Sequence, residues 1–123
     1  MSGVEFNPVK GAIADFNLSP TQGSETGKIR PCIVVTNDVY NFRLTVIQVV
    51  PITQWSEKKS RIVTNITLEP SKQNGLSKKS IADCLQTRPI DYTKRFVRDR
   101  GIIEANFLQA IDNALLILFD LSI

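Results

Sequence analysis

The segment LTVIQVVPI, residues 44–52, is apolar at nearly every position. A strand with one face in water alternates apolar and polar residues, whereas an unbroken apolar run is typical of a strand covered on both faces. Residues that disfavour strands bound the set of three expected strands between residues 11 and 52, with Pro8 and Gly11 before the set and residues 54–60 after it. We therefore expect residues 44–52 to form the central strand of a sheet.

Shorter segments on either side of this run predict the rest of the sheet. They are rich in Val, Ile and Phe, or alternate apolar with polar residues as an edge strand does. A polar loop at residues 70–77 carries the Asn74-Gly75 pair, which is a strong turn signal. The additional expected strands are residues 11–16, 31–36, 62–68 and 80–86.

The C-terminal part of the chain changes to the helix period. From Glu104 onward, apolar residues recur three or four positions apart, which predicts a helix of about four turns. Leu116, Ile117 and Phe119 lie off this stripe, so a second surface is needed to cover them, either the curling sheet or another subunit. The residues of the stripe are Phe107, Leu108, Ile111, Ala114, Leu115 and Leu118.

Together these elements indicate one mainly β domain with helices, spanning residues 1–123 as a small, strongly curved sheet or barrel with a C-terminal α-helix. The content of 42% hydrophobic and 22% charged residues is that of a globular protein. A net charge of +3 permits binding to a polyanion without requiring it. We see no signal peptide and no membrane-spanning segment, so we expect a cytoplasmic protein.

The absence of histidine restricts the chemistry more than any other feature of the composition. Without imidazole there is no Ser-His or Cys-His pair and little prospect of a zinc site. Cys32 and Cys84 lie in apolar, strand-like segments and are expected to be buried thiols. The carboxylates are too scattered for a calcium or two-metal site, so we expect an activity that needs neither metal nor cofactor.

The loop GSETGKIRP, residues 23–31, places both signs of charge between and beside two glycines. Glu25, Lys28 and Arg30 either approach a ligand there or belong to a solvated surface loop. Because Pro31 begins the next expected strand, Arg30 should be held more firmly than the rest of the loop.

Further polar groups stand where the expected strands end. Thr53 either caps the central strand or directs its hydroxyl into a cleft. Gln86 and Arg88 suit a base edge and a phosphate, or form an ordinary polar exit from the fifth strand. A later basic run alternates with Asp91 and Asp99, which favours a salt-bridged surface over a track for nucleic acid. The run consists of Lys94, Arg95, Arg98 and Arg100.

The order of these segments resembles the MazF/PemK family of toxins from bacterial type II toxin–antitoxin systems. The resemblance covers about residues 9–121 and depends on the ordered set rather than on any single piece. The set consists of Asp15-Phe16, GSETGKIRP, CIVVTND, VVPIT, GLSKKS, Gln86 and Arg88 with Ile90-Asp91 and Arg95, and AIDNALLILFDL.

The resemblance implies a fold, an activity and partners. The fold is the small SH3-like β-barrel of MazF/CcdB-like toxins, usually as a homodimer. The activity is a ribosome-independent, metal-independent endoribonuclease, an mRNA interferase that cuts single-stranded mRNA at short sequences. The partner is a cognate MazE-like antitoxin, which inhibits the toxin by laying a disordered segment across the RNA groove and acts with it in DNA binding.

By the same resemblance the catalytic arginine falls on Arg30 and the catalytic threonine on Thr53. Attack of the RNA 2′-hydroxyl on its own phosphate gives 2′,3′-cyclic phosphate and 5′-hydroxyl ends. We expect Arg30 to stabilise the phosphate as a candidate proton donor, and Thr53 to position it. Since arginine is a poor base, Glu25 is the expected general base or substrate orienter. The residues expected to bind RNA are Ser24, Thr26, Lys28, Gln86 and Arg88.

Three positions depart from the usual family pattern: Ala12 and Leu85 stand where an acidic residue is frequent, and Pro89 replaces a small polar residue. We expect these changes to affect the choice of cleavage sequence more than the activity.

Two other functions stay open on this sequence. One is a non-catalytic toxin on the same barrel that binds a protein target such as gyrase, and the presence of both Arg30 and Thr53 argues against it. The other is an SH3-like interaction module, for which Trp55, Tyr40 and Tyr92 supply few aromatic side chains.

Overall fold

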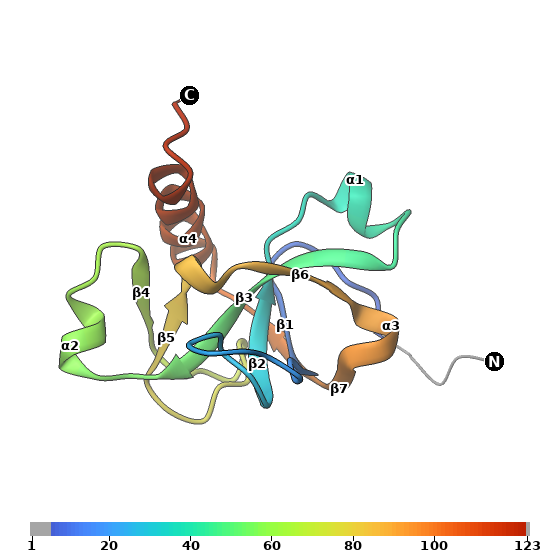
Figure 1. Cartoon of the computed structure of the whole chain (residues 1–123), viewed down its shortest axis with the longest axis horizontal. Helices are drawn as coiled ribbons and strands as arrows, with labels where there is room; N and C mark the ends of the chain where they lie inside the picture. Colours follow the sequence, from blue (N-terminus) through green and yellow to red (C-terminus); the bar gives the residue numbers. More distant parts are fainter. Residues whose placement is uncertain (1–5, 123) are drawn as a thin grey trace.

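The computed structural model describes residues 6–122, which form seven strands and several short helices, followed by one longer helix (Figure 1). In chain order the elements are β1 (Ala12–Asn17), β2 (Ile29–Val34), α1 (Asp38–Asn41), β3 (Val46–Gln54), α2 (Glu57–Ser60), β4 (Asn65–Leu68), β5 (Ser80–Asp83), the 3₁₀ helix η1 (Cys84–Gln86), β6 (Arg88–Asp91), α3 (Tyr92–Arg95), β7 (Phe96–Ile102) and α4 (Ala105–Leu118).

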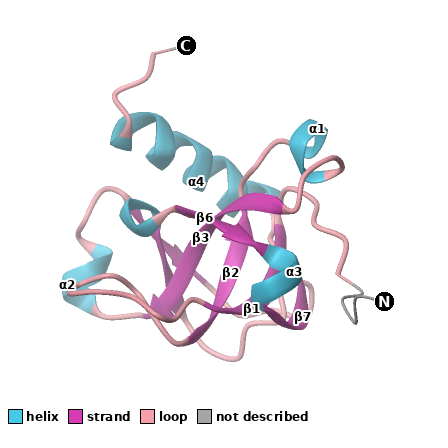
Figure 2. Ribbon diagram, turned by 45° about the vertical axis from the view of Figure 1, so that its right-hand side comes forward, coloured by secondary structure: helices cyan, strands magenta, loops and turns pink. Residues whose placement is uncertain are grey.

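All strand pairs are antiparallel, and β3 lies at the centre of the sheet. The order is β4-β5-β3-β2-β1-β7, with β6 paired to the first half of β3 and β5 to its last three residues. Strand β3 therefore has partners along both edges, as the apolar run at residues 44–52 predicted. The predicted fold class, mainly β with a C-terminal helix, is confirmed, and the sheet is open and strongly curved (Figure 2).

The prediction that β3 is covered on both faces is wrong for its first half. Val46 and Gln48 are exposed while Ile47 between them is buried, and continuous burial extends only from Val49 to Ile52. The first half of β3 thus follows the alternation of a strand with one face in water.

Several predicted boundaries also change. The fourth strand begins at Asn65, because Ser56 caps α2 and the chain then turns through the exposed Ile62 and Val63. The fifth strand ends at Asp83, where η1 begins. Strands β6 and β7 were not predicted, since the charged residues of β7 resemble a solvated surface segment.

Two buried clusters fill the two sides of the curved sheet. The first lies beneath α4 and includes Ile33, Val50 and Ile52 from the sheet with Ile111 and Ala114 from the helix. The second is aromatic: the Phe6 ring stacks on Phe96 with centroids 5.0 Å apart and meets the edge of Phe16 at 5.7 Å. Helix α4 has the predicted length and inner stripe, but Ile117 and Phe119 on its other side are exposed.

Candidate active site

The segment between β1 and β2 is a closed loop. The Leu18 amide donates to the Lys28 carbonyl at 2.8 Å, and the Lys28 amide donates to the Ser19 hydroxyl at 2.7 Å. Within the loop, Glu25 Oε1 accepts the Gln22 amide hydrogen at 2.7 Å. Arg30 is the second residue of β2, so the expected start of this strand at Pro31 is two residues late and Arg30 stands on the sheet itself.

Arg30 and Thr53 come from neighbouring strands and line the same cavity. Strands β2 and β3 pair as far as Cys32 and Pro51, and Arg30 and Thr53 lie two residues beyond that pair on their respective strands. The Arg30 Nε and the Thr53 Oγ1 are both buried and lack a hydrogen-bond partner. Such atoms have lost their water without gaining a protein partner, a state that costs free energy and calls for an explanation.

Three adjoining cavities run from η1 past Arg30 to the end of β3. The Gln86 cavity, about 400 Å³, and the loop cavity, about 420 Å³, share Glu25. The loop cavity and the Thr53 cavity, about 280 Å³, share Arg30. The Gln86 cavity is lined by Glu25, Thr26, Leu85, Gln86, Thr87, Arg88 and Pro89. The loop cavity is lined by Ser19, Pro20, Thr21, Glu25, Gly27, Lys28 and Arg30. The Thr53 cavity is lined by Arg30, Pro31, Ile52, Thr53, Gln54, Leu76, Ser77, Lys78, Ser80 and Arg100.

The side chains selected from the sequence therefore gather around these three cavities, which share Glu25 and Arg30 and together are called the groove, although they come from the β1–β2 loop, β2, β3 and η1. Of the eight predicted site residues, seven line at least one of the three cavities. Ser24 is the exception; it is exposed, and its backbone carbonyl is engaged by Gln86.

Gln86 has a different environment from the one its sequence position suggested. Its amide Oε1 accepts the Thr26 amide hydrogen at 3.2 Å, and its Nε2 donates to the Ser24 carbonyl at 3.2 Å. Both ends of the side-chain amide are thus used by the backbone on either side of Glu25. Arg88 is likewise anchored, with Nη1 donating to the Leu18 carbonyl at 3.0 Å.

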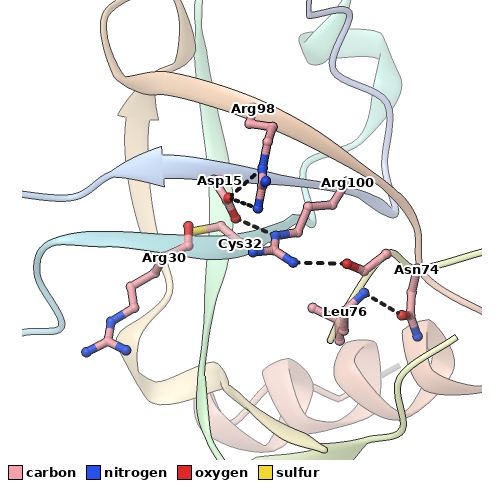
Figure 3. A network of polar contacts seen from close by, with 8 residues as sticks. Asp15, Arg30, Cys32, Asn74, Leu76, Arg98 and Arg100 are labelled. Carbon is pink, nitrogen blue, oxygen red and sulfur yellow. Dashed lines mark hydrogen bonds and ion pairs between the residues drawn. The ribbon is translucent and has the colours of Figure 1, made fainter. Parts of the chain in front are cut away.

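The basic run after β6 is engaged within the protein, as its alternation with acidic residues indicated, but its partner is Asp15 of β1. Arg100 Nε donates to Asp15 Oδ1 at 2.6 Å, and Arg98 Nη2 lies 3.2 Å from Asp15 Oδ2 (Figure 3). Arg95 donates to the carbonyls of Asn17 and Ser19, both at 2.8 Å.

Asp15 belongs to the ordered set that resembles the family, but no role beside the candidate site was predicted for it. It is 6% exposed, and the other residues of its strand, apart from the terminal Asn17, are small or apolar. A charged residue inside the mostly apolar sequence AIADFN is itself a signal, because a buried carboxylate is found almost only with a paired cation.

Electrostatics favour an anion in this groove. Its lining contains five cationic side chains and, among the described residues, one carboxylate, that of Glu25. The cations are Lys28, Arg30, Lys78, Arg88 and Arg100.

The two cysteines are buried and unpaired, as predicted. Burial raises the pKa of the Cys84 thiol to about 12, and burial together with nearby Asp15 raises the pKa of Cys32 further still. Neither thiol is suited to act as a nucleophile. Between residues 6 and 122 no three His, Cys, Asp or Glu side chains group as metal ligands, and no helix is long and apolar enough to cross a membrane.

The three departures from the family pattern fall in two places. Leu85, which is 65% exposed, and Pro89 lie in the wall of the Gln86 cavity beside Gln86 and Arg88. Ala12 is instead buried in the aromatic cluster and lines none of the three cavities.

A small, strongly curved antiparallel sheet with a cationic groove across its strand ends defines a compact β-sheet protein suited to bind an anionic ligand. A family model described as PemK-like, MazF-like toxin of type II toxin-antitoxin system matches residues 10–119, and the chain belongs to this family. It is 32% identical over 106 residues to the endoribonuclease MazF of Staphylococcus epidermidis, with 86% of each chain covered.

Solved structures agree on the fold. The crystal structure of MazF from Deinococcus radiodurans has a TM-score of 0.79 at 23% identity, covering 95% of this chain and 100% of that one. The Mycobacterium tuberculosis toxin MazF-mt6 has a TM-score of 0.72 at 26% identity, covering 91% and 99%. A MazE-MazF structure from Deinococcus radiodurans has a TM-score of 0.71 at 22% identity, covering 95% and 100%.

Proposed function

We propose that this toxin-family chain is an endoribonuclease that cuts single-stranded mRNA in the groove around Arg30, without a metal ion. The observation that supports this most directly is that two of the four buried side-chain polar atoms without a hydrogen-bond partner in the described residues, Arg30 Nε and Thr53 Oγ1, belong to residues that line the same cavity. A phosphate oxygen would satisfy both donors. The name of the Staphylococcus epidermidis relative supports the same activity.

The reaction needs no external nucleophile, because the RNA 2′-hydroxyl attacks the adjacent phosphorus and the 5′-oxygen of the next nucleotide departs. The products are a 2′,3′-cyclic phosphate and a 5′-hydroxyl end. Negative charge builds up on the phosphate oxygens as the new bond forms. Arg30 stabilises that charge through its planar guanidinium, and Thr53 adds a hydroxyl hydrogen bond.

Two proton transfers accompany the attack. Glu25, which lines the loop cavity together with Arg30, accepts the proton of the 2′-hydroxyl or orients that hydroxyl. Arg30 is the candidate donor to the leaving 5′-oxygen. The RNA strand follows the groove, with Lys28 and Arg88 near its phosphates and Ser24, Thr26 and Gln86 along the loop side.

The decisive experiment is the incubation of a long single-stranded RNA with the purified protein in EDTA, followed by mapping of the ends. The parent protein should cut at specific short sequences, whereas Arg30→Ala and Thr53→Ala should each lose about a hundredfold or more in rate. Lys58→Ala, an exposed change on α2 away from the groove lining, is the control. RNA that stays intact at high protein concentration would exclude the nuclease.

The remaining parts of the proposal concern partners and location. A MazE-like antitoxin with a disordered segment would inhibit the protein by occupying the groove; related toxins have been solved as MazE-MazF complexes and with a cognate antitoxin.

A homodimer would cover the exposed side of α4 at Ile117 and Phe119. We further propose one domain across residues 1–123 and a cytoplasmic site of action. Sedimentation showing only monomer at micromolar concentration would contradict the dimer.

A further inference from the structure

We propose that Arg100, together with Lys78, forms a second phosphate subsite for the RNA strand, one nucleotide or more away from the phosphate that Arg30 holds. The inference rests on the proposed nuclease function. It assigns a binding role to two residues outside the set predicted from the sequence, and it starts from the shape of the Thr53 cavity.

The Thr53 cavity contains three cationic side chains, Arg30, Lys78 and Arg100, and no carboxylate among the residues of its lining. It shares Arg30 with the loop cavity, so a strand bound at Arg30 has the Thr53 cavity beside it. Electrostatic attraction to successive phosphates is what holds a single strand in a groove.

Arg100 is held in position for a ligand. Its Nε donates to Asp15 Oδ1 at 2.6 Å and its Nη1 to the Gly75 carbonyl at 2.9 Å, while its side chain is 18% exposed. A guanidinium carries five N–H donors, and these two bonds use two of them. Asp15 is shared with Arg98, so one carboxylate is set against two guanidinium groups and the cluster keeps a positive charge.

Arg100 and Arg30 approach the cavity from different sides. Asp15 pairs with Pro31 across β1 and β2, and neighbouring residues of a strand point to opposite faces, so Arg30 points away from the Asp15 ion pairs. Figure 3 shows this divergence. The two arginines are therefore suited to two phosphates of one strand rather than to a single phosphate.

Arg98 offers a matched control. It stands on the same strand as Arg100 and pairs with the same carboxylate, but its side chain is 66% exposed and it is not part of the lining of the Thr53 cavity. Arg98→Ala removes the same charge from the same cluster without touching the cavity. A general loss of positive charge would affect both variants equally, whereas a subsite would single out Arg100.

The test measures binding of a DNA strand that has the cleaved sequence and cannot be cut, as a function of salt. Arg100→Ala and Lys78→Ala should each weaken binding about tenfold, and each should lower the slope of log K against log salt by about 0.7, the value for one phosphate contact on a single strand. Arg98→Ala should change the slope by much less. Strands shortened from one end should abolish the effect of Arg100→Ala at the length that removes its phosphate.

Thermal unfolding of each variant separates folding from binding. Lys78 is exposed, and its side chain makes no hydrogen bond or ion pair with the described residues, so Lys78→Ala decides the case even where Arg100→Ala unfolds. Equal effects of Arg98→Ala and Arg100→Ala, or unchanged salt slopes in both Arg100→Ala and Lys78→Ala, would overturn the subsite. If Arg100→Ala and Lys78→Ala bind poly-glutamate more weakly than the parent but bind the DNA strand equally well, the subsite is also overturned. The cations would then be assigned to an acidic protein partner.

The same measurements distinguish a failure of the subsite proposal from a failure of the nuclease proposal. If the parent protein binds the strand with the predicted Arg100 dependence but never cuts RNA, the nuclease proposal fails and the anion subsite stands. If the parent cuts RNA and the Arg100 and Lys78 variants bind the strand like the parent, the subsite fails alone.

Discussion

Gln86 holds the backbone on both sides of Glu25, accepting from the Thr26 amide and donating to the Ser24 carbonyl, each at 3.2 Å. Gln86 and Glu25 are far apart in the chain. The two hydrogen bonds between η1 and the loop hold the backbone that carries Glu25, whose side chain lines both the Gln86 cavity and the loop cavity. A side chain expected to read a base edge is thus occupied in positioning the candidate base.

Gln86→Ala should therefore slow cleavage without changing the sequence that is cut. The loop would lose two hydrogen bonds and Glu25 its fixed position, so we expect a lower kcat, about tenfold or more, with KM little changed. End mapping on a long RNA gives the cleavage sequence, and hydrogen exchange reports the Thr26 amide, which should lose protection. Gln22→Ala, an exposed change in the same loop, is the control. Cleavage at altered sequences would show that Gln86 reads a base instead.

Glu25→Gln separates the proton-transfer role of Glu25 from its structural role. The variant keeps an oxygen that can accept the Gln22 amide hydrogen, as Glu25 Oε1 does at 2.7 Å, so the loop should keep its shape. It loses the ability to accept a proton, and single-turnover cleavage should fall by about 10²-fold or more. A single-turnover rate equal to that of the parent would remove the base role and leave Glu25 as an orienting residue.

The sequence was sufficient for the fold class, the central strand and the residues around Arg30, because each has a local signal. The apolar run at residues 44–52 indicates a strand with neighbours on both sides, and Pro31 indicates the start of β2 to within two residues. Strands β6 and β7 have no such signal. Their pairing depends on contacts with β3 and β1, which lie far away in the chain.

The sequence predicts which residues gather around the cavities better than it predicts the contacts that these residues make. Nothing local to Gln86 shows that its amide would be used by a loop 60 residues earlier. Asp15 and Arg100 are separated by 85 residues, and their ion pair follows only from the pairing of β1 with β7. Polar side chains satisfy whichever buried groups the fold brings near them, so their partners are a property of tertiary structure.

Glu104 anchors the loop that follows β4, and this anchoring should weaken at acid pH. Burial raises the pKa of this carboxyl, but hydrogen bonds from the Ser71 hydroxyl at 2.6 Å and the Asn74 amide at 3.0 Å outweigh it, so the pKa is lowered overall. A lowered pKa in the folded state means that this contribution to stability is present above the unfolded-state pKa, about 4.3, and is lost as the pH falls through the folded-state value.

Urea unfolding between pH 7 and pH 3 tests this linkage. The free energy of unfolding of Glu104→Gln should depend less on pH below about 5 than that of the parent. Glu57→Gln is the control, because Glu57 makes a surface pair with Arg61 in which both side chains are about three-quarters exposed. Parallel curves for the parent and Glu104→Gln would contradict the assignment.

Gly75 connects this loop to Arg100, and its replacement should be unusually costly. Its φ is +69°, and an added Cβ would collide with the Arg100 carbonyl oxygen, which is backbone and cannot move aside. Gly23 is the matched control: its φ is +56°, but an added Cβ would meet no atom within 4 Å. Gly23→Ala should cost only the backbone strain of a left-handed alanine, about 1–2 kcal/mol. Gly75→Ala should cost that strain and the collision as well, so its unfolding midpoint in urea should be clearly lower. Equal midpoints would show that the approach of Gly75 to Arg100 is not tight, and the carbonyl that holds the Arg100 guanidinium would then be less firmly placed than we infer.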